Sequence, residues 1–215
     1  MNLQDELLSR FSTDSWDYEI LKDAAESVVN INGLSLELGV REGGSSKMMI
    51  DAFLKTPKIK RTHIALDPYG NLPYYYSTSE WRNDPGPYGN SMRDFVVPGL
   101  LLYCANTNVD FLFYQMTDCE FMKRFSDGIP VYNTPGNACL AEKYALVHID
   151  GPHITEDTLS ETIFFEERSV IGTHLVYDDV EGYYDHEQIR KYLLEREWVV
   201  KKETDKKISY VKVGK

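Results

Sequence analysis

Acidic side chains stand where short apolar runs of the sequence end. Asp150 ends the run YALVHID, and the adjacent pair Asp178 and Asp179 ends GTHLVYDD. Carboxylates that meet without partners repel one another, so either one takes up a proton or a cation lies between them. Oxygen-only ligands favour Mg²⁺, Mn²⁺ or Ca²⁺ over a thiolate-seeking metal. We therefore expect Asp150, Asp178 and Asp179 to bind a divalent cation, with Mg²⁺ the first candidate.

A histidine follows the first of these acids at short range. His153 lies three residues after Asp150, in the turn GPHIT. An imidazole at this distance can act as a general base near neutral pH, so we assign proton transfer to His153 together with Asp150. Two structural alternatives stay open: His153 caps a helix that begins near Thr155, and Asp179 caps the segment that follows it.

A glycine-rich turn joins the predicted strand over 34–40 to a helix that contains KMMIDAFL. Glu37 lies inside the strand, and Gly39, Gly43 and then Ser45 follow. Such a turn lets a ligand approach the backbone, and the helix start offers free N–H groups. The turn predicts a cofactor site, with an ordinary strand-to-helix connection as the equal alternative. At Gly39 we expect a larger side chain to block the cofactor and leave the fold intact.

Two further positions follow predicted strands. Asp67 ends THIALD and, in a doubly wound sheet, holds the ribose of a bound nucleoside; alternatively it only begins a turn with Pro68. Thr117 follows the strand predicted over 109–115, which places it near an adenine ring. Thr117 or Asp118 also caps the short helix that we expect up to Phe125.

The order of the predicted elements indicates the fold class. Strands alternate with helices along the chain, and a β-hairpin ends it. We predict an α/β fold: a Rossmann-like, doubly wound, mostly parallel seven-stranded sheet with a C-terminal antiparallel hairpin. The expected strands cover 34–40, 62–67, 109–115, 144–150, 172–179, 197–203 and 206–214.

The remaining segments complete the predicted organisation. Residues 1–33 form a helical extension on the sheet, with Trp16 on the apolar face of a helix over 14–30 that Asp14 caps, and 34–215 form one domain. The aromatic segment 69–90 reads as a long loop whose role stays open. We expect a helix over 91–105 that is interrupted near Pro98, and a loop over 126–137.

Composition excludes several classes of function. The 215 residues carry a formal net charge of −11 with no basic block, which argues against nucleic acid as a partner. No apolar run is long enough for a membrane span, and the N-terminus lacks the pattern of a signal peptide. Three cysteines without metal-ligand spacing suit a reducing compartment. We expect a soluble, cytoplasmic protein with a small-molecule substrate; its assembly into oligomers stays open.

Four motifs together resemble a known family. ELGVREGGSS, ALD, ALVHIDGPH and THLVYDDV look like the class I S-adenosylmethionine-dependent methyltransferases of the macrocin O-methyltransferase and cephalosporin-hydroxylase-like group. The resemblance runs from about residue 34 to 180. It departs from the family before the fifth strand, where Gly172-Thr173 replaces paired glycines.

The resemblance implies a role for each motif. The first would hold the methionine part of the cofactor through Glu37, Gly39 and Gly43, and Asp67 would hold the ribose. The three acids of the later motifs would hold the metal, and His153 would be the base. The implied reaction is methyl transfer to a hydroxyl that the metal acidifies.

Two alternatives to methyl transfer stay open. A metal-dependent hydroxylase of the same fold is one, although the usual pair of iron-binding histidines is missing. The other is a non-catalytic cofactor-binding module, or a nicotinamide enzyme that uses the same glycine turn. The glycine spacing departs from G-x-G-x-x-G, which argues against binding of a dinucleotide.

Overall fold

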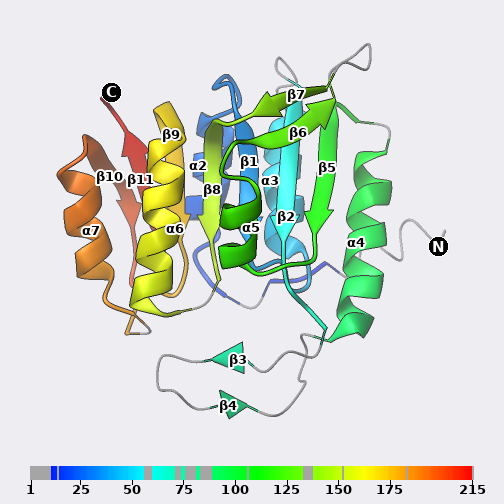
Figure 1. The fold of residues 1–215 in the computed structure, drawn as a ribbon, viewed down its shortest axis with the longest axis horizontal. Coiled ribbons are helices and arrows are strands. Elements are labelled where there is room, and N and C mark those ends of the chain that lie inside the picture. Colours follow the sequence, from blue (N-terminus) through cyan, green and yellow to red (C-terminus); the bar gives the residue numbers. More distant parts are fainter. Residues whose placement is uncertain are drawn as a thin grey trace.

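A computed structural model describes residues 11–13, 15–55, 60–70, 74–75, 81–82, 89–105, 107–132, 138–151, 153–182 and 184–214, with backbone only at 74–75 and 81–82. Seven strands form one sheet in the order β10-β11-β9-β8-β1-β2-β5 (Figure 1). The strands from β5 to β9 in that order are parallel, and β11 is antiparallel to both neighbours. The predicted fold class is therefore confirmed. The strands are β1 (Leu34–Leu38), β2 (Arg61–Leu66), β5 (Val109–Tyr114), β8 (Tyr144–Ile149), β9 (Ser169–Tyr177), β10 (Trp198–Glu203) and β11 (Ile208–Lys212).

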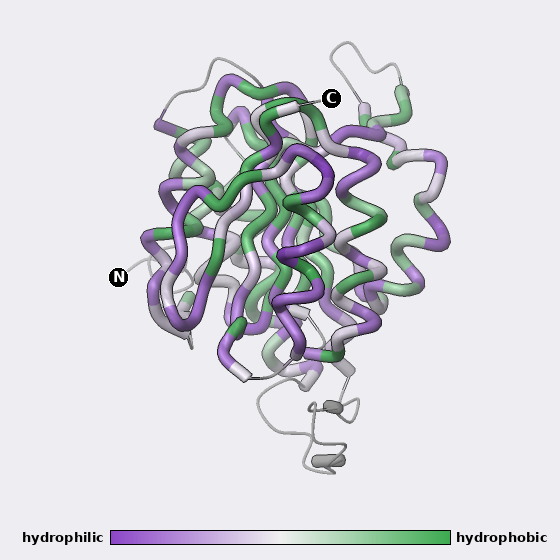
Figure 2. Tube along the Cα trace, turned by 90° about the vertical axis from the view of Figure 1, so that its left-hand side faces the viewer, coloured by the Kyte–Doolittle hydropathy of each residue, from purple (hydrophilic) through white to green (hydrophobic). Residues whose placement is uncertain are grey.

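Helices cover both faces of this sheet. One face carries α2 (Glu19–Ser27), α3 (Gly44–Lys55) and α4 (Asn90–Cys104), and the other carries α5 (Asp118–Arg124), α6 (Thr155–Glu167) and α7 (His186–Leu194). Each face has its own hydrophobic core cluster, and successive strand residues alternate between the two. In Figure 2, hydrophilic and hydrophobic residues alternate along the outer helices, while the strands carry longer hydrophobic stretches. No helix within the described ranges is long and apolar enough to cross a membrane.

The N-terminal helix is shorter than predicted. It begins at Glu19, after Tyr18, which makes no side-chain cap, and Trp16 is 72% exposed, so its place on the apolar face was wrong. The chain before the helix instead crosses to the glycine turn, where Ser12 forms a β-bridge with Gly43. The predicted cap, Asp14, lies outside the described residues. Helix α2 packs against α3 and the sheet, and the domain division at residue 33 stays a prediction.

Two segments that the sequence predicts to be irregular form regular secondary structure. Helix α4 continues through Pro98, because the packing of Val96, Gly99 and Leu100 outweighs the one hydrogen bond that proline cannot donate. The predicted loop 126–137 instead contains β6 (Ile129–Tyr132), which pairs with β7 (Ala138–Ala141) in a separate hairpin. Both strands are short and most of their residues are exposed, and neither shows the alternation of apolar and polar residues that would mark a strand.

The aromatic segment contains a second small pairing. Strand β3 (Tyr74–Tyr75) pairs with β4 (Trp81–Arg82) inside the predicted loop. The structure describes no other residue between 71 and 88 and no side chain in that range. The role of the segment, which the sequence leaves open, is therefore untested.

Candidate functional site

The carboxyl ends of four neighbouring parallel strands bring the predicted residues to one edge of the sheet. Backbone hydrogen bonds join the turns that follow these strands. The Gly39 amide donates to Leu66 at 2.9 Å, and the Asp150 amide donates to Leu38 at 3.0 Å. The Asp178 amide donates to Ile149 at 3.0 Å. The acids and the glycine turn therefore meet where doubly wound folds bind their ligands.

The space left by the glycines is filled by the protein itself. Gly39 has φ +84°, and a Cβ there would lie 2.0 Å from the Asp150 carbonyl oxygen. A Cβ on Gly43 would lie 2.8 Å from Val96 Cγ1, and the Gly44 amide donates to the Ser12 carbonyl at 3.1 Å. The expectation that a larger residue at Gly39 would leave the fold intact is therefore wrong. These glycines let the turn after β8, helix α4 and the N-terminal segment approach closely.

Glu37 is the centre of a buried polar network. One oxygen of its carboxylate accepts a hydrogen bond from the Ser46 hydroxyl, and the other oxygen lies 3.1 Å from His148 Nδ1. Ser46 Oγ lies 3.3 Å from His63 Nε2, whose Nδ1 is 3.0 Å from Ser35 Oγ. Burial lowers the pKa of His63 to about 4, which keeps its ring neutral. The role of Glu37 toward the methionine part of a cofactor stays a prediction.

Asp67 fastens the glycine turn. Its carboxylate accepts from the amides of Val40 at 3.0 Å, Arg41 at 3.1 Å and Tyr69 at 2.8 Å, and the residue is 1% exposed. Burial raises the pKa of Asp67, while the three hydrogen bonds act in the opposite direction. The alternative in which Asp67 begins a turn with Pro68 agrees with these contacts. Its ribose role stays a prediction.

The two hydroxyls predicted to face a cofactor differ in their surroundings. Thr117 Oγ1 accepts from the Glu120 amide at 3.2 Å, so Thr117 caps α5 as the helix-cap alternative required. Ser45 is buried in the first turn of α3, directly after the glycine turn. A contact of either with a cofactor stays a prediction.

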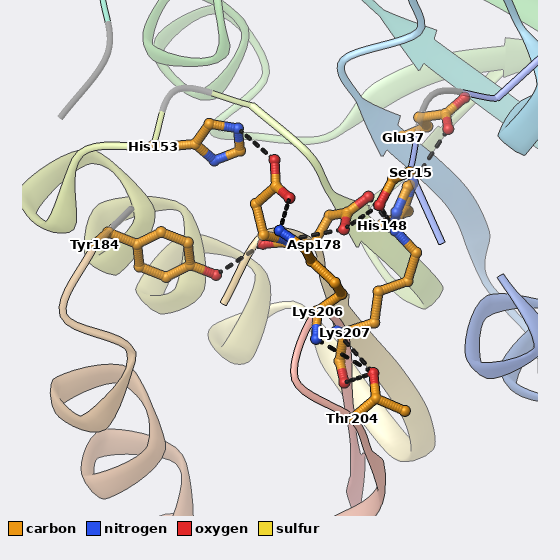
Figure 3. Close-up of polar contacts among 10 residues, drawn as sticks. Ser15, Glu37, His148, His153, Asp178, Tyr184, Thr204, Lys206 and Lys207 are labelled. Carbon is orange, nitrogen blue, oxygen red and sulfur yellow. Dashed lines mark hydrogen bonds and ion pairs between the residues drawn. The ribbon is translucent and has the colours of Figure 1, made fainter. Parts of the chain in front are cut away.

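His153 forms a pair with Asp179. Its Nε2 lies 3.3 Å from Asp179 Oδ2, and its ring stacks on Tyr184 with an interplanar angle of 7° (Figure 3). Helix α6 begins at Thr155 with no side-chain cap, so the alternative in which His153 caps it is wrong. Burial lowers the pKa of His153, while Asp179 opposes that shift. In a neutral imidazole one ring nitrogen carries the proton and the other can accept one.

The three predicted metal ligands do not form one cluster. Among the described residues, one set of donor atoms within 4.8 Å of one another comes from Asp150, His153 and Asp179. A second set comes from His148, Asp150 and Asp178. Burial, and next the neighbouring Asp178, raise the pKa of Asp150 well above its usual range. Asp150 thus stands between two groups, and the predicted trio is divided between them.

Asp178 already has a cationic partner. The Lys207 ammonium donates to Asp178 Oδ2, and Ser15 Oγ donates to Asp178 Oδ1 at 3.0 Å. Lys207 and Asp178 are both buried. A divalent cation therefore fits Asp150 and Asp179, with His153 beside them, and fits Asp178 only if Lys207 moves away. These contacts therefore give Asp178 no role as a metal ligand.

The sequence reading missed Lys207, Ser15 and His148. Lys207 directly precedes β11, whose register pairs Ile208 with Tyr177 of β9 and so sets Lys207 opposite Asp178. The sequence predicts the C-terminal hairpin but not that β11 lies beside β9. That neighbour relation brings Lys207 to Asp178. His148 stands two residues before Asp150 in β8, so strand alternation could have placed both on one side.

Comparisons with known proteins give similarity at the level of structure. No protein-family model matches the chain, and no curated protein matches it. The calicheamicin methyltransferase CalS11 superposes with a TM-score of 0.58 at 12% identity, covering 99% of this chain and 91% of that one. The O-methyltransferase NovP gives 0.57 at 14% identity, covering 91% of this chain and 79% of that one. An O-methyltransferase from Bacillus cereus in complex with SAH gives 0.59 at 9% identity, covering 97% and 90%. The chain therefore shares its fold with these solved methyltransferases.

Within that fold, the edge that carries His153, Asp150 and Asp178 is the carboxyl edge of the parallel strands. The two helical layers and the hairpin β10–β11 position this edge. The methyltransferase fold by itself assigns no substrate, because one fold supports many chemistries.

Proposed function

We propose that the chain is an S-adenosylmethionine-dependent O-methyltransferase that acts on a hydroxyl of a small molecule. The observation that carries the proposal is the His153–Asp179 pair at the carboxyl edge, 3.3 Å between Nε2 and Oδ2. The fold shared with solved O-methyltransferases supports it. So does the resemblance of the motifs to the macrocin O-methyltransferase group. A net charge of −11 favours a small molecule over nucleic acid as the substrate.

The pair supplies the proton transfer of the reaction. His153 takes the proton of the substrate hydroxyl on the ring nitrogen that faces away from Asp179, and Asp179 stabilises the imidazolium that forms. S-adenosylmethionine supplies the methyl group on a positively charged sulfur. On transfer of the methyl group, the neutral thioether would be the leaving group, and His153 would later release the proton to water. The protein's main task is to hold the two reactants in line.

The chain has groups that fit a nucleoside cofactor. Among the described residues Asp67 Oδ1 accepts one hydrogen bond, from the Tyr69 amide, and a carboxylate oxygen can accept two. Asp67 would therefore hold a ribose hydroxyl while it fastens the glycine turn. The other proposed contacts, as in the sequence prediction, are Glu37, Gly39, Gly43, Ser45 and Thr117.

A divalent cation such as Mg²⁺ is proposed only for part of the predicted set. Asp150 and Asp179 would hold it, and it would lower the pKa of a bound substrate hydroxyl. Asp178 is engaged with Lys207 and would not contribute.

Calorimetry on the purified chain tests the cofactor. We expect S-adenosylhomocysteine to bind and NAD not to bind, because the turn departs from the dinucleotide pattern. Binding of NAD without binding of S-adenosylhomocysteine would sink the proposal.

Replacement of His153 tests the base. We expect His153→Ala to lower the rate of methyl transfer by about 10²–10⁴-fold, with the affinity for S-adenosylhomocysteine unchanged. Tyr184→Phe, which keeps the ring that stacks on His153, serves as the matched control. A variant that loses thermal stability but keeps its rate per folded molecule would show that His153 is structural.

A further inference from the structure

Lys207 is held in place by the turn of the C-terminal hairpin. The Thr204 amide donates to the Lys207 carbonyl at 2.9 Å, and the Lys207 amide donates to Thr204 Oγ1 at 3.1 Å. Strand β11 then runs antiparallel to β9, with Ile208 opposite Tyr177. The lysine side chain consequently starts beside the residue that follows Tyr177, which is Asp178 (Figure 3).

The Lys207 ammonium is enclosed by three groups from distant parts of the chain. It donates to Asp178 Oδ2 and to Ser15 Oγ, the latter at 2.9 Å. The Tyr18 ring centroid lies 4.1 Å from Nζ, which is cation–π contact distance. Lys207 is 0% exposed, so bulk water does not solvate its charge. Ser15 also donates to Asp178 Oδ1, which closes a triangle of polar contacts.

This ammonium stands where the site needs positive charge. Asp178 is buried next to Asp150, and two carboxylates at such a position oppose each other's ionisation. Lys206, the neighbour of Lys207, lies 3.8 Å from the outer acid Asp179 and 3.7 Å from Glu181. The positive charge of Lys207 thus balances the negative charge of Asp178. An oxygen-binding divalent ion would otherwise lie at this position.

We propose that Lys207 is a built-in cation that takes the place of a divalent ion at Asp178, so that no metal binds through Asp178 in the native protein. The set of donor atoms from Asp150, His153 and Asp179 does not include Asp178. The inference deepens the proposed function, on which its meaning for methyl transfer rests. Its test does not need methyl transfer.

Binding of Mn²⁺, followed by the electron paramagnetic resonance of the free ion, tests the proposal. We expect Lys207→Gln to open Asp178 and to bind Mn²⁺ about tenfold or more tightly than the native chain, because the site gains a carboxylate ligand and loses a competing charge. Lys212→Gln is the matched control. It removes a lysine–carboxylate pair, with Glu166, at the other end of the same strand and should leave Mn²⁺ binding unchanged.

Asp178→Asn in the native background provides the second measurement, in case Lys207→Gln does not fold. We expect it to leave Mn²⁺ binding as it is in the native chain, because Asp178 is not a ligand there. Weaker binding in Asp178→Asn, or equal binding in a folded Lys207→Gln, would overturn the proposal. Binding of S-adenosylhomocysteine is measured on the same samples, so a failure of the cofactor prediction is distinguished from a failure of this one.

Discussion

Gly39, directly after β1, packs against the turn that follows β8 at the carboxyl edge. Its φ of +84° lies in the left-handed region, and its missing side chain makes room for the Asp150 carbonyl. The same contact sets the backbone of Asp150, whose side chain belongs to the proposed site. Close packing at one glycine thus positions a carboxylate of the proposed site.

Gly39→Ala should lower the free energy of unfolding by roughly 3 kcal/mol or more, because backbone strain adds to a contact of 2.0 Å. Urea denaturation measures the change. Gly182→Ala is the matched control, since Gly182 has φ +78° and nothing within 4 Å of an added Cβ. The control should cost about 1–2 kcal/mol, the left-handed strain alone. Equal costs at the two positions would contradict the close approach at Gly39.

At the level of elements, helices α5 and α6 enclose two carboxyl groups that face each other, those of Asp118 and Glu161. Glu161 of α6 is 0% exposed, and in the described part of the chain neither of its side-chain oxygens has a hydrogen bond. Asp118 of α5 faces it, and its Oδ2 is also buried without a partner. Burial, followed by the neighbouring Asp118, raises the pKa of Glu161 well above its usual range. The interface therefore favours a protonated Glu161.

The free energy of unfolding should depend on pH because of this shift in the pKa of Glu161. A carboxyl whose folded-state pKa is raised stabilises the fold below its unfolded pKa and loses that contribution as the pH rises through the folded value. Glu161→Gln should remove the loss, so the variant should gain on the native chain as the pH rises above about 4.5. We expect a gain of about 1–3 kcal/mol at neutral pH, because the Gln amide can donate to Asp118 Oδ2, which is otherwise a buried acceptor without a donor among the described residues.

Urea denaturation at a series of pH values measures the difference between the two chains. Glu167→Gln, on the exposed side of the same helix, controls for the removal of one acidic side chain. A difference between Glu161→Gln and the native chain that does not change with pH would show that Glu161 is not the group responsible.

In the molecule as a whole, helix α2 near the N-terminus packs beside the last strands of the chain. Strand β11, near the C-terminus, lies between β10 and β9, and α2 packs against β9 and β11. Lys202 of β10 pairs with Asp23 of α2 at 2.7 Å. Ser15 and Lys207 bring the same two regions together at the site. The site is therefore complete only when the last strands are in place.

A chain that ends at Arg196 should fail to form the native monomer. It lacks β10 and β11, and with them the buried Trp198, Ile208 and Tyr210, and it leaves the apolar strand β9 as an open edge. Size-exclusion chromatography and near-ultraviolet circular dichroism should show aggregation and loss of fixed aromatic packing. A chain that ends at Lys212 keeps both strands and serves as the control. A folded, monomeric short chain would contradict the central place of β11.

The sequence by itself determined the order and type of the main elements. Short apolar runs and the turns between them marked the sheet strands, and alternation with helices predicted parallel pairing. Since parallel strands end at one edge, the acids at the strand ends could be brought together without coordinates. His153, three residues after Asp150, was found by the same reasoning.

Only the tertiary structure decided the partners of these groups. Contacts between residues far apart in the chain leave no periodic signal, because they depend on which strand inserts where and on how closely the turns pack. The pairing of Lys207 with Asp178, the Asp150 carbonyl beside Gly39 and the three amides on Asp67 are all of this kind. A carboxylate at a strand end can hold a metal, a lysine or the backbone, and the neighbour that folding brings within hydrogen-bond distance decides which.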